Sequence, residues 1–369
     1  MYDLDKHPYF ERYTDPASGV ESFILTEKIT PLVQSMYFTN QAMSSDERLL
    51  WFYCGFPPSP YKSLGVMSLD PDNPFIKNFP ASVFADASPA VAPEGDAVYY
   101  AIKTKLYKLY LTGEIEEFAE LDPDYVGNRR VEKISTHLTM SCDGKYLLLD
   151  GLIGNKWFVA TIDTATKKTN IIHEFRQCYN HSQFSPVVPN LFLIDQDNHI
   201  DPITGEQYIF DHRMWLMNLE QTMFAPAVPR NWFEHNSVNA HDFWSADGYL
   251  CWIDYKLGAF EMNVSTSEIN HVWKTPLCHA HTSSNRKYWC ADESPYKWHE
   301  KPCKVIFYNR ETEKETDIFS SLPQPYIPMA DYHLHPHPQF SPKDNYITST
   351  TTVKGDIDIA ITPVDQLIN

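Results

Sequence analysis

The sequence lacks the features that mark membrane-spanning, exported and thiolate-metal proteins. None of its apolar runs approaches the roughly 18 residues that a membrane span needs. The amino-terminal segment is polar and has no apolar core of a signal peptide. The seven cysteines form no Cys-x-x-Cys pair, so we expect buried free thiols in a reducing compartment. We therefore expect a cytoplasmic protein, although a periplasmic protein that has lost its leader would look the same.

Positive charge is also scarce. The chain has 30 Lys and Arg against 48 Asp and Glu, which gives a net charge of −18. Nucleic acids and anionic membranes repel such a surface, so neither is expected as a partner. An acidic small substrate would need a local cluster of cations to overcome the repulsion from the negative charge of the protein. The oligomeric state is not indicated by the sequence.

Aromatic residues are plentiful, and strand-turn-strand units repeat along the chain. Turns that follow a shared motif are anchored at residues 46, 94, 143, 187, 247, 285 and 343. The steps between these anchors are 48, 49, 44, 60, 38 and 58 residues. Seven units of about four strands predict an all-β, seven-bladed β-propeller around a central channel. We expect one domain over residues 1–369, with the segment from Ser22 completing the last blade and no amphipathic helix.

Five repeats carry a histidine at the same position, four residues before the turn begins. These histidines are His137, His181, His241, His279 and His337, and two earlier repeats have Asn40 and Ser88 there. The position falls at the start of the innermost strand, so in a ring these side chains converge on the channel mouth. The alternative is that they are polar plugs of the channel, which is the favoured interpretation for His137 and His181.

A metal site is predicted where His335 and His337 alternate on one extended segment. Alternate residues of a strand point to the same side, so both imidazoles can reach one ion, and His279 from the preceding blade can supply a third. Three imidazoles with open positions suit a divalent transition metal. The segment could instead be only a stiff proline-rich loop.

His241 has no metal-spaced partner in its own segment, which suits a neutral general base. Cations recur in the loops between second and third strands, and Arg213 among them can hold a carboxylate through two bonds. The other candidates for substrate binding are Tyr332, His181, Lys256 and Trp215.

These residue types fit β-elimination on a uronic acid. The proton on C5 becomes acidic when the neighbouring carboxylate is neutralised by a metal or an arginine, and a histidine can then remove it. Hydrolysis would call for two carboxylic acids flanking the bond, and no such pair stands at the repeat register.

At these residues the sequence resembles the oligogalacturonate lyases, which are seven-bladed propeller polysaccharide lyases. The matching segments begin at His181, Arg213, His241, His279 and His335. The resemblance implies a manganese-type site at His279, His335 and His337, a base at His241 and a carboxylate-binding Arg213. It departs where Tyr332 replaces a glutamine ligand, which leaves calcium or no ion as alternatives, and where Asp242 and His281 replace the family's residues.

The first blade is more similar to propellers that act on rhamnose–glucuronic acid ends of arabinogalactan. The sequence-based hypothesis is therefore a lyase that cleaves acidic, uronate-containing oligosaccharides of the pectin type. An α-L-rhamnosidase or rhamnose–glucuronate lyase, and a propeller that only binds glycans, are the alternatives.

Overall fold

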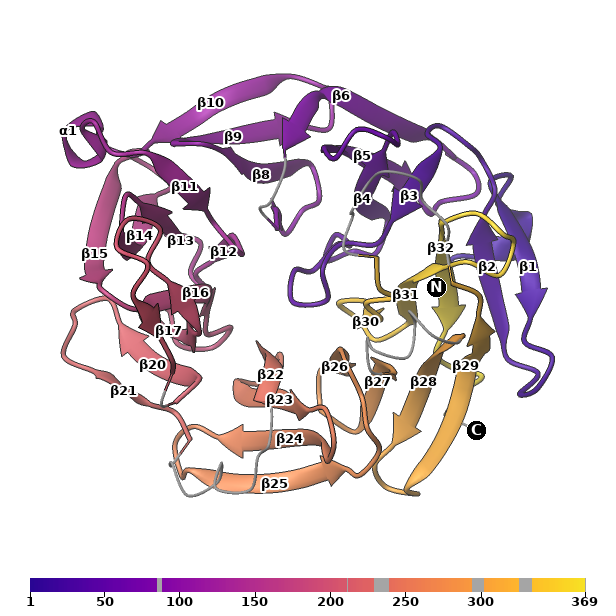
Figure 1. Cartoon of the computed structure of the whole chain (residues 1–369). Coiled ribbons are helices and arrows are strands. Elements are labelled where there is room, and N and C mark those ends of the chain that lie inside the picture. Colours follow the sequence, from indigo (N-terminus) through magenta and orange to yellow (C-terminus); the bar gives the residue numbers. More distant parts are fainter. Residues whose placement is uncertain (85–87, 211, 229–238, 294–301, 325–333, 369) are drawn as a thin grey trace.

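Seven β-sheets form a closed ring in the computed structural model of the chain (Figure 1). The structure describes residues 1–84, 88–210, 212–228, 239–293, 302–324 and 334–368. The predicted seven-bladed β-propeller is therefore confirmed. Five blades have four strands and two have five. The only helices in the described residues are a single 3-10 turn, η1 (Leu4–Lys6), and α1 (Pro123–Val126).

The strands run outwards from the centre within each blade. Blade 1 contains β3 (Leu32–Gln34), β4 (Leu49–Gly55), β5 (Lys62–Ser68) and β6 (Ile76–Phe84), and blade 2 contains β7 (Ala90–Val91), β8 (Ala97–Ile102), β9 (Lys105–Tyr110) and β10 (Ile115–Glu120). Blade 3 contains β11 (Val131–Ile134), β12 (Thr139–Met140), β13 (Tyr146–Ile153), β14 (Lys156–Asp163) and β15 (Thr169–Phe175). Blade 4 contains β16 (Cys178–Phe184), β17 (Leu191–Asp197), β20 (Met214–Asn218) and β21 (Phe224–Pro226), with the extra hairpin β18 (His199–Ile200) and β19 (Gln207–Tyr208).

The remaining three blades complete the ring. Blade 5 contains β22 (Asn239–Trp244), β23 (Tyr249–Asp254), β24 (Gly258–Asn263) and β25 (Glu268–Trp273), and blade 6 contains β26 (Ala280–Thr282), β27 (Tyr288–Asp292), β28 (Cys303–Asn309) and β29 (Lys314–Leu322). Blade 7 contains β30 (Gln339–Phe340), β31 (Tyr346–Thr351), β32 (Asp358–Pro363), β2 (Glu21–Leu25) and β1 (Phe10–Thr14).

Strands from both ends of the chain close the ring in blade 7. Strand β2 pairs antiparallel with β32, with Phe23 opposite Ile361 and Ile24 opposite Ala360. The prediction that the Ser22 segment completes the last blade is thus confirmed. Because β2 and β32 are far apart in sequence, this pairing ties the first and last blades together.

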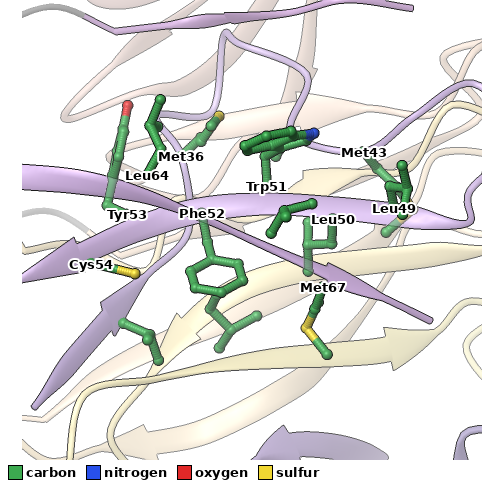
Figure 2. Packing of buried hydrophobic residues seen from close by; sticks show 14 of the residues in the cluster. Met36, Met43, Leu49, Leu50, Trp51, Phe52, Tyr53, Cys54, Leu64 and Met67 are labelled. Carbon is green, nitrogen blue, oxygen red and sulfur yellow. The ribbon is translucent and has the colours of Figure 1, made fainter. Parts of the chain in front are cut away.

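Apolar residues on both faces of the middle strands form the cores between neighbouring blades. In β4 all seven residues are buried, and Figure 2 shows Trp51 and Tyr53 projecting to one side of the strand and Phe52 to the other. Such a near-continuous apolar run is expected where a strand is covered on both faces. The packed blade interfaces hold the innermost strands at a fixed radius, and this positions the residues at the centre.

Buried hydrogen-bond acceptors within the second strand also join adjacent blades. The Asp150 carboxylate accepts from the backbone N–H of Thr136 at 3.1 Å and from that of Ser182 in the next blade at 2.9 Å. Thr350 makes the equivalent connection from blade 7 to blade 1 through Ser35, whose N–H lies 3.0 Å from the Thr350 hydroxyl. We call these residues inter-blade latches.

All seven cysteines are free thiols, and six of them are buried. This matches the expectation of unpaired thiols. Within the ranges that the structure describes, we find no helix with the length and apolarity to span a bilayer.

Candidate active site

The histidines of the shared register lie on the innermost strands or directly before them. His181 lies within β16 and His241 within β22, whereas His279 immediately precedes β26. His181, His241 and His337 adopt φ values of 54°, 52° and 45°. In β16 and β22 the strand register shifts at this point, so a bulge turns the side chain away from the regular pleat. Left-handed backbone at a non-glycine residue is costly and is concentrated at functional sites.

The side chains of this register meet at the centre of the ring. The His241 and His279 rings stack with centroids 4.0 Å apart, and His279 and His337 are 4.4 Å apart. His137 and His181 form a second pair at 5.1 Å. His335, which lies outside the register, is 5.0 Å from His279. The structure therefore brings the predicted base and the three predicted metal ligands into one cluster.

Two aromatic residues from blade 1 fill the middle of this cluster. The Tyr37 ring lies 5.1 Å from His137 and 4.9 Å from His337, so it connects the two histidine groups. The Phe38 ring lies 5.2 Å from His279. Sequence analysis did not select Tyr37 or Phe38, since the repeat register in blade 1 falls on Asn40. The Asn40 side chain instead donates to the Pro89 and Leu138 carbonyls.

His279, His335 and Asp292 form a group that could hold a metal ion. One donor atom from each lies within 4.8 Å of the others, and all three residues are buried. The Asp292 carboxylate accepts from His279 Nδ1 at 3.0 Å and from the His337 backbone N–H at 3.2 Å. A carboxylate that binds one ring nitrogen leaves the other nitrogen as the metal ligand, which is a usual arrangement around bound ions. Imidazoles held in this way suit a divalent transition metal.

The predicted set was His279, His335 and His337. The structure places Asp292 with the first two histidines, and it places the His337 ring beside His279. Direct ligation by His337 stays a prediction. Tyr332, which replaces the glutamine of the resembled family, lies outside the described residues.

His241 is held as a neutral imidazole with one nitrogen able to accept a proton. Its Nδ1 lies 2.6 Å from the Cys278 carbonyl oxygen, so Nδ1 carries the hydrogen and donates it. The Tyr255 hydroxyl lies 3.3 Å from Nε2, which is left as the basic nitrogen. Burial and the adjacent His279 ring lower the pKa of His241 well below its usual value. The ring is therefore unprotonated at neutral pH, as general base catalysis requires.

Arg213 lies at the start of β20 and is surrounded by carboxylates. Its guanidinium pairs with Asp195 at 2.8 Å, with Asp242 at 3.3 Å and, more closely still, with Asp197. It also lies 3.3 Å from His181 Nδ1. Only 10 % of the Arg213 side chain is exposed. A substrate carboxylate would therefore meet an arginine that already binds three acidic side chains, and its role as a carboxylate clamp stays a prediction.

The carboxyl groups around Arg213 differ in their protonation. Burial raises the pKa of Asp195 to about 6, and burial together with Asp195 raises the pKa of Asp242 well above its usual value. For Asp197, the nearby Arg213 and His181 outweigh burial and lower the pKa. Asp242 therefore holds a proton near neutral pH, whereas Asp195 loses its proton as the pH rises through about 6. Asp197 stays ionised.

This carboxyl pair was not found from the sequence. Asp195 lies on the second strand of its blade, away from the histidine register, and its side chain is fully buried. The Asp242 side chain is 1 % exposed. Both acids lie beneath Arg213 and cannot flank a glycosidic bond in this conformation. The sequence predicts no carboxyl pair at the repeat register, and neither of these acids occupies that register.

The other predicted substrate-binding residues lie in different surroundings. His181 contacts Arg213 and stacks near His137, and burial followed by the Arg213 charge lowers its pKa. Trp215 packs on Phe224 with ring centroids 4.8 Å apart. Lys256 is exposed in the turn between β23 and β24.

A second register in the sequence could have revealed the missed acids. Aspartate directly follows the apolar run of the second strand in four blades, at Asp150, Asp195, Asp254 and Asp292. All four are almost fully buried. A buried aspartate needs a cation or a hydrogen-bond donor beside it, and in blades 4 and 6 these partners are the site residues Arg213 and His279.

The sequence matches no protein-family model and no curated protein. The chain is similar in structure to two oligogalacturonate lyases. One is a complex with manganese and the other is from Vibrio parahaemolyticus. Each superposes with a TM-score of 0.77 at 17 % identity, covering 96 % of this chain and 96 % of the lyase.

A dipeptidyl peptidase 4 of Porphyromonas gingivalis also matches, with a TM-score of 0.51 at 8 % identity over 99 % of this chain and 58 % of that protein. At such identities the comparisons show a shared propeller fold. The resemblance to oligogalacturonate lyases drawn from the sequence is confirmed at that level.

Proposed function

We propose that the protein is a polysaccharide lyase that cleaves uronate-containing oligosaccharides by β-elimination. The observation that carries this proposal is the His241 imidazole, whose Nδ1 is committed to the Cys278 carbonyl while Nε2 remains basic. It stacks on His279, which belongs to the group able to hold an ion. A base next to a carboxylate-binding cation is what removal of a proton beside a carboxylate needs.

In the proposed reaction His241 Nε2 takes the proton from C5 of the uronate. The electron pair of that C–H bond forms the C4–C5 double bond, and the bond from C4 to the glycosidic oxygen breaks. The departing oxygen keeps the electron pair of that bond and takes a proton from water, and His241 releases its proton to the solvent. His279 and His335, with His337 in the predicted set, would hold a divalent ion, and this ion would supply a Lewis acid that neutralises the substrate carboxylate. Asp292 orients His279 through Nδ1, and the Cys278 carbonyl fixes the tautomer of His241.

Manganese is the proposed ion, because the lyase complex with manganese shares the fold. Calcium, or no ion, is the alternative that the substitution at Tyr332 leaves open. An acidic oligosaccharide of the pectin type is the proposed substrate, and the cytoplasm is the proposed compartment.

A hydrolase that releases rhamnose from glucuronate is the second candidate, and Asp197 is the observation that favours it. The Asp197 side chain is 27 % exposed and ionised beside Arg213. Retaining and inverting glycosidases, however, use two carboxyl groups that both reach the bond. Asp195 and Asp242 are too deeply buried to supply the second one, so the elimination is preferred.

The test is incubation with oligogalacturonides and, separately, with rhamnosyl-glucuronate glycans, each with and without added manganese or calcium. The proposal predicts a rise in ultraviolet absorbance from the new double bond with at least one of these substrates. Free rhamnose without an unsaturated product would support the hydrolase. The absence of any rise with every uronate substrate would overturn the lyase proposal.

A further inference from the structure

An open pocket of ≈ 390 Å³ lies where blades 3 and 4 meet, outside the ring of histidines. Its lining comes from the end of β15, the start of β16, the hairpin β18–β19 and β21. That hairpin is the only two-stranded sheet outside the seven blades in the described part of the chain. The volume is within the range of small-molecule sites, which is about 300–1,000 Å³.

The pocket has an aromatic floor with one ring turned to solvent. Phe224 is 39 % exposed, and it stacks on Trp215 at 4.8 Å. Tyr179 supports the same ring at 5.5 Å, and Phe175 supports it at 5.7 Å. A buried aromatic base below an exposed ring makes a rigid, flat platform. Such a platform suits the C–H face of a sugar ring, since both surfaces are apolar and nearly planar.

The rim of the pocket is polar and is held in place by its own hydrogen bonds. Arg176 donates to the Tyr208 hydroxyl at 2.8 Å and to Glu206 at 2.9 Å, and the Tyr208 hydroxyl donates to Glu206 at 2.7 Å. These groups offer donors and acceptors to the hydroxyls of a sugar without first having to be ordered. The lining also includes Glu174, so its carboxylates outnumber its one guanidinium. A negatively charged sugar is therefore disfavoured here.

We propose that this pocket is a binding subsite for an uncharged pyranose unit. The subsite would hold a neutral sugar of the same oligosaccharide whose uronate lies at the histidine cluster. In that respect it rests on the proposed function, whereas the binding of a neutral sugar does not. Nothing in the lyase chemistry itself calls for this second, uncharged site.

Two strands connect the pocket with the candidate active site. On β16, Tyr179 of the pocket is two residues from His181, which corresponds to about 7 Å along a strand. Trp215 is likewise two residues from Arg213, and its ring backs the Phe224 platform. An oligosaccharide extending from the histidine cluster can therefore reach the pocket within a few sugar units. This also gives Trp215 a role in substrate binding through Phe224.

The test compares sugars that differ only in charge on a variant of the platform. Methyl galactoside and methyl galacturonoside are titrated into the wild type, Phe224→Ala, Phe224→Trp and Tyr61→Ala, with binding followed by saturation-transfer NMR. Tyr61 is a matched control, because it is an aromatic residue of 52 % exposure that does not line the pocket. Because Phe224 also packs on Trp215, its truncation should lower the thermal midpoint modestly, so binding is measured well below the midpoint of each variant.

The proposal predicts that methyl galactoside binds the wild type, Tyr61→Ala and Phe224→Trp alike. Its affinity should fall about tenfold in Phe224→Ala, as expected for the loss of one aromatic platform. Binding of methyl galacturonoside should not change with Phe224→Ala. With neutral-sugar-bearing uronate oligosaccharides as substrates, Phe224→Ala should raise KM and leave kcat unchanged.

Methyl galactoside binding that is equal in the wild type and Phe224→Ala, or absent from both, would overturn the proposal. A preference of the Phe224-dependent site for methyl galacturonoside would overturn it as well. The results can contradict the proposed lyase function and the proposed neutral subsite independently of each other. If no unsaturated product forms but Phe224-dependent binding of methyl galactoside persists, the lyase function is wrong and the neutral subsite stands.

Discussion

Replacing Asp292 with asparagine tests whether one buried carboxylate both joins two blades and prepares the metal site. Asp292 is fully buried and accepts from the His279 backbone N–H at 2.9 Å, from His279 Nδ1 at 3.0 Å and from the His337 backbone N–H at 3.2 Å. Asparagine keeps one acceptor oxygen and turns an NH₂ group towards the remaining donors. Each donor that loses its acceptor in a buried site costs about 1–3 kcal/mol, so we expect Asp292→Asn to lower the free energy of unfolding by about 2–4 kcal/mol.

The same substitution should weaken metal binding. Once the carboxylate no longer fixes the tautomer and orientation of His279, the affinity for Mn²⁺ should fall by about 10- to 100-fold, the usual cost of losing such a partner. Urea denaturation measures the first effect and calorimetric titration of chelator-treated protein the second.

Asp150→Asn is the matched control for this prediction. Asp150 is an equally buried latch, but it accepts from Thr136 and Ser182 and contacts no predicted ligand. We expect comparable destabilisation without a change in Mn²⁺ affinity. Equal Mn²⁺ affinity in the wild type, Asp292→Asn and Asp150→Asn would refute the reasoning about His279.

Three further predictions concern the base, the buried acids and the ion. His241→Asn should reduce the rate of unsaturated product formation by about 10²- to 10⁴-fold in a kinetic assay. Its circular dichroism should stay unchanged, since asparagine tolerates the positive φ at this position. Asp195 has its pKa raised from 3.8 to about 6, so the folded protein holds a proton that the unfolded chain releases. Its contribution to stability is complete below about pH 4 and is lost as the pH rises through about 6, and Asp195→Asn should flatten that part of the stability–pH curve. Treatment with a chelator should lower the thermal midpoint, and Mn²⁺ at about 100 times its Kd should restore about 2.7 kcal/mol. A midpoint that responds equally to Mg²⁺ would contradict a site built from imidazoles.

The fold could be predicted from the sequence because its strongest signals are periodic. The repeated turns and the apolar second strands predicted repeating blades that pack against one another. The Ser22 segment predicted that a strand near the start of the chain, β2, completes the last blade. The convergence of His241, His279 and His337 followed from the same periodicity, since one position in each repeat means one place in the ring.

The environment of those residues could not be predicted in the same way. Arg213 was selected as a free cation, but its partners Asp195 and Asp242 come from two different blades and meet it only in the folded ring. Tyr37 contacts His137 and His337 from a loop that does not follow the repeat. The spacing of the repeats predicts which residues lie at the same distance from the axis of the ring. It does not predict the partners of a buried charge, because these are side chains that reach across from a neighbouring blade. The aspartates that follow the apolar runs of the second strands are the signal that a closer comparison of the repeats would have found.

Product analysis in water labelled with heavy oxygen tests the central claim most directly. Elimination divides the substrate without adding water, whereas hydrolysis places one water oxygen in the products. With the uronate oligosaccharide that the protein cleaves, the lyase account predicts one fragment with a C4–C5 double bond and, after correction for exchange of the anomeric oxygen with the solvent, fragment masses that sum to that of the substrate. Fragments without a double bond whose masses sum to the substrate plus one molecule of water would contradict it and would establish a hydrolase instead.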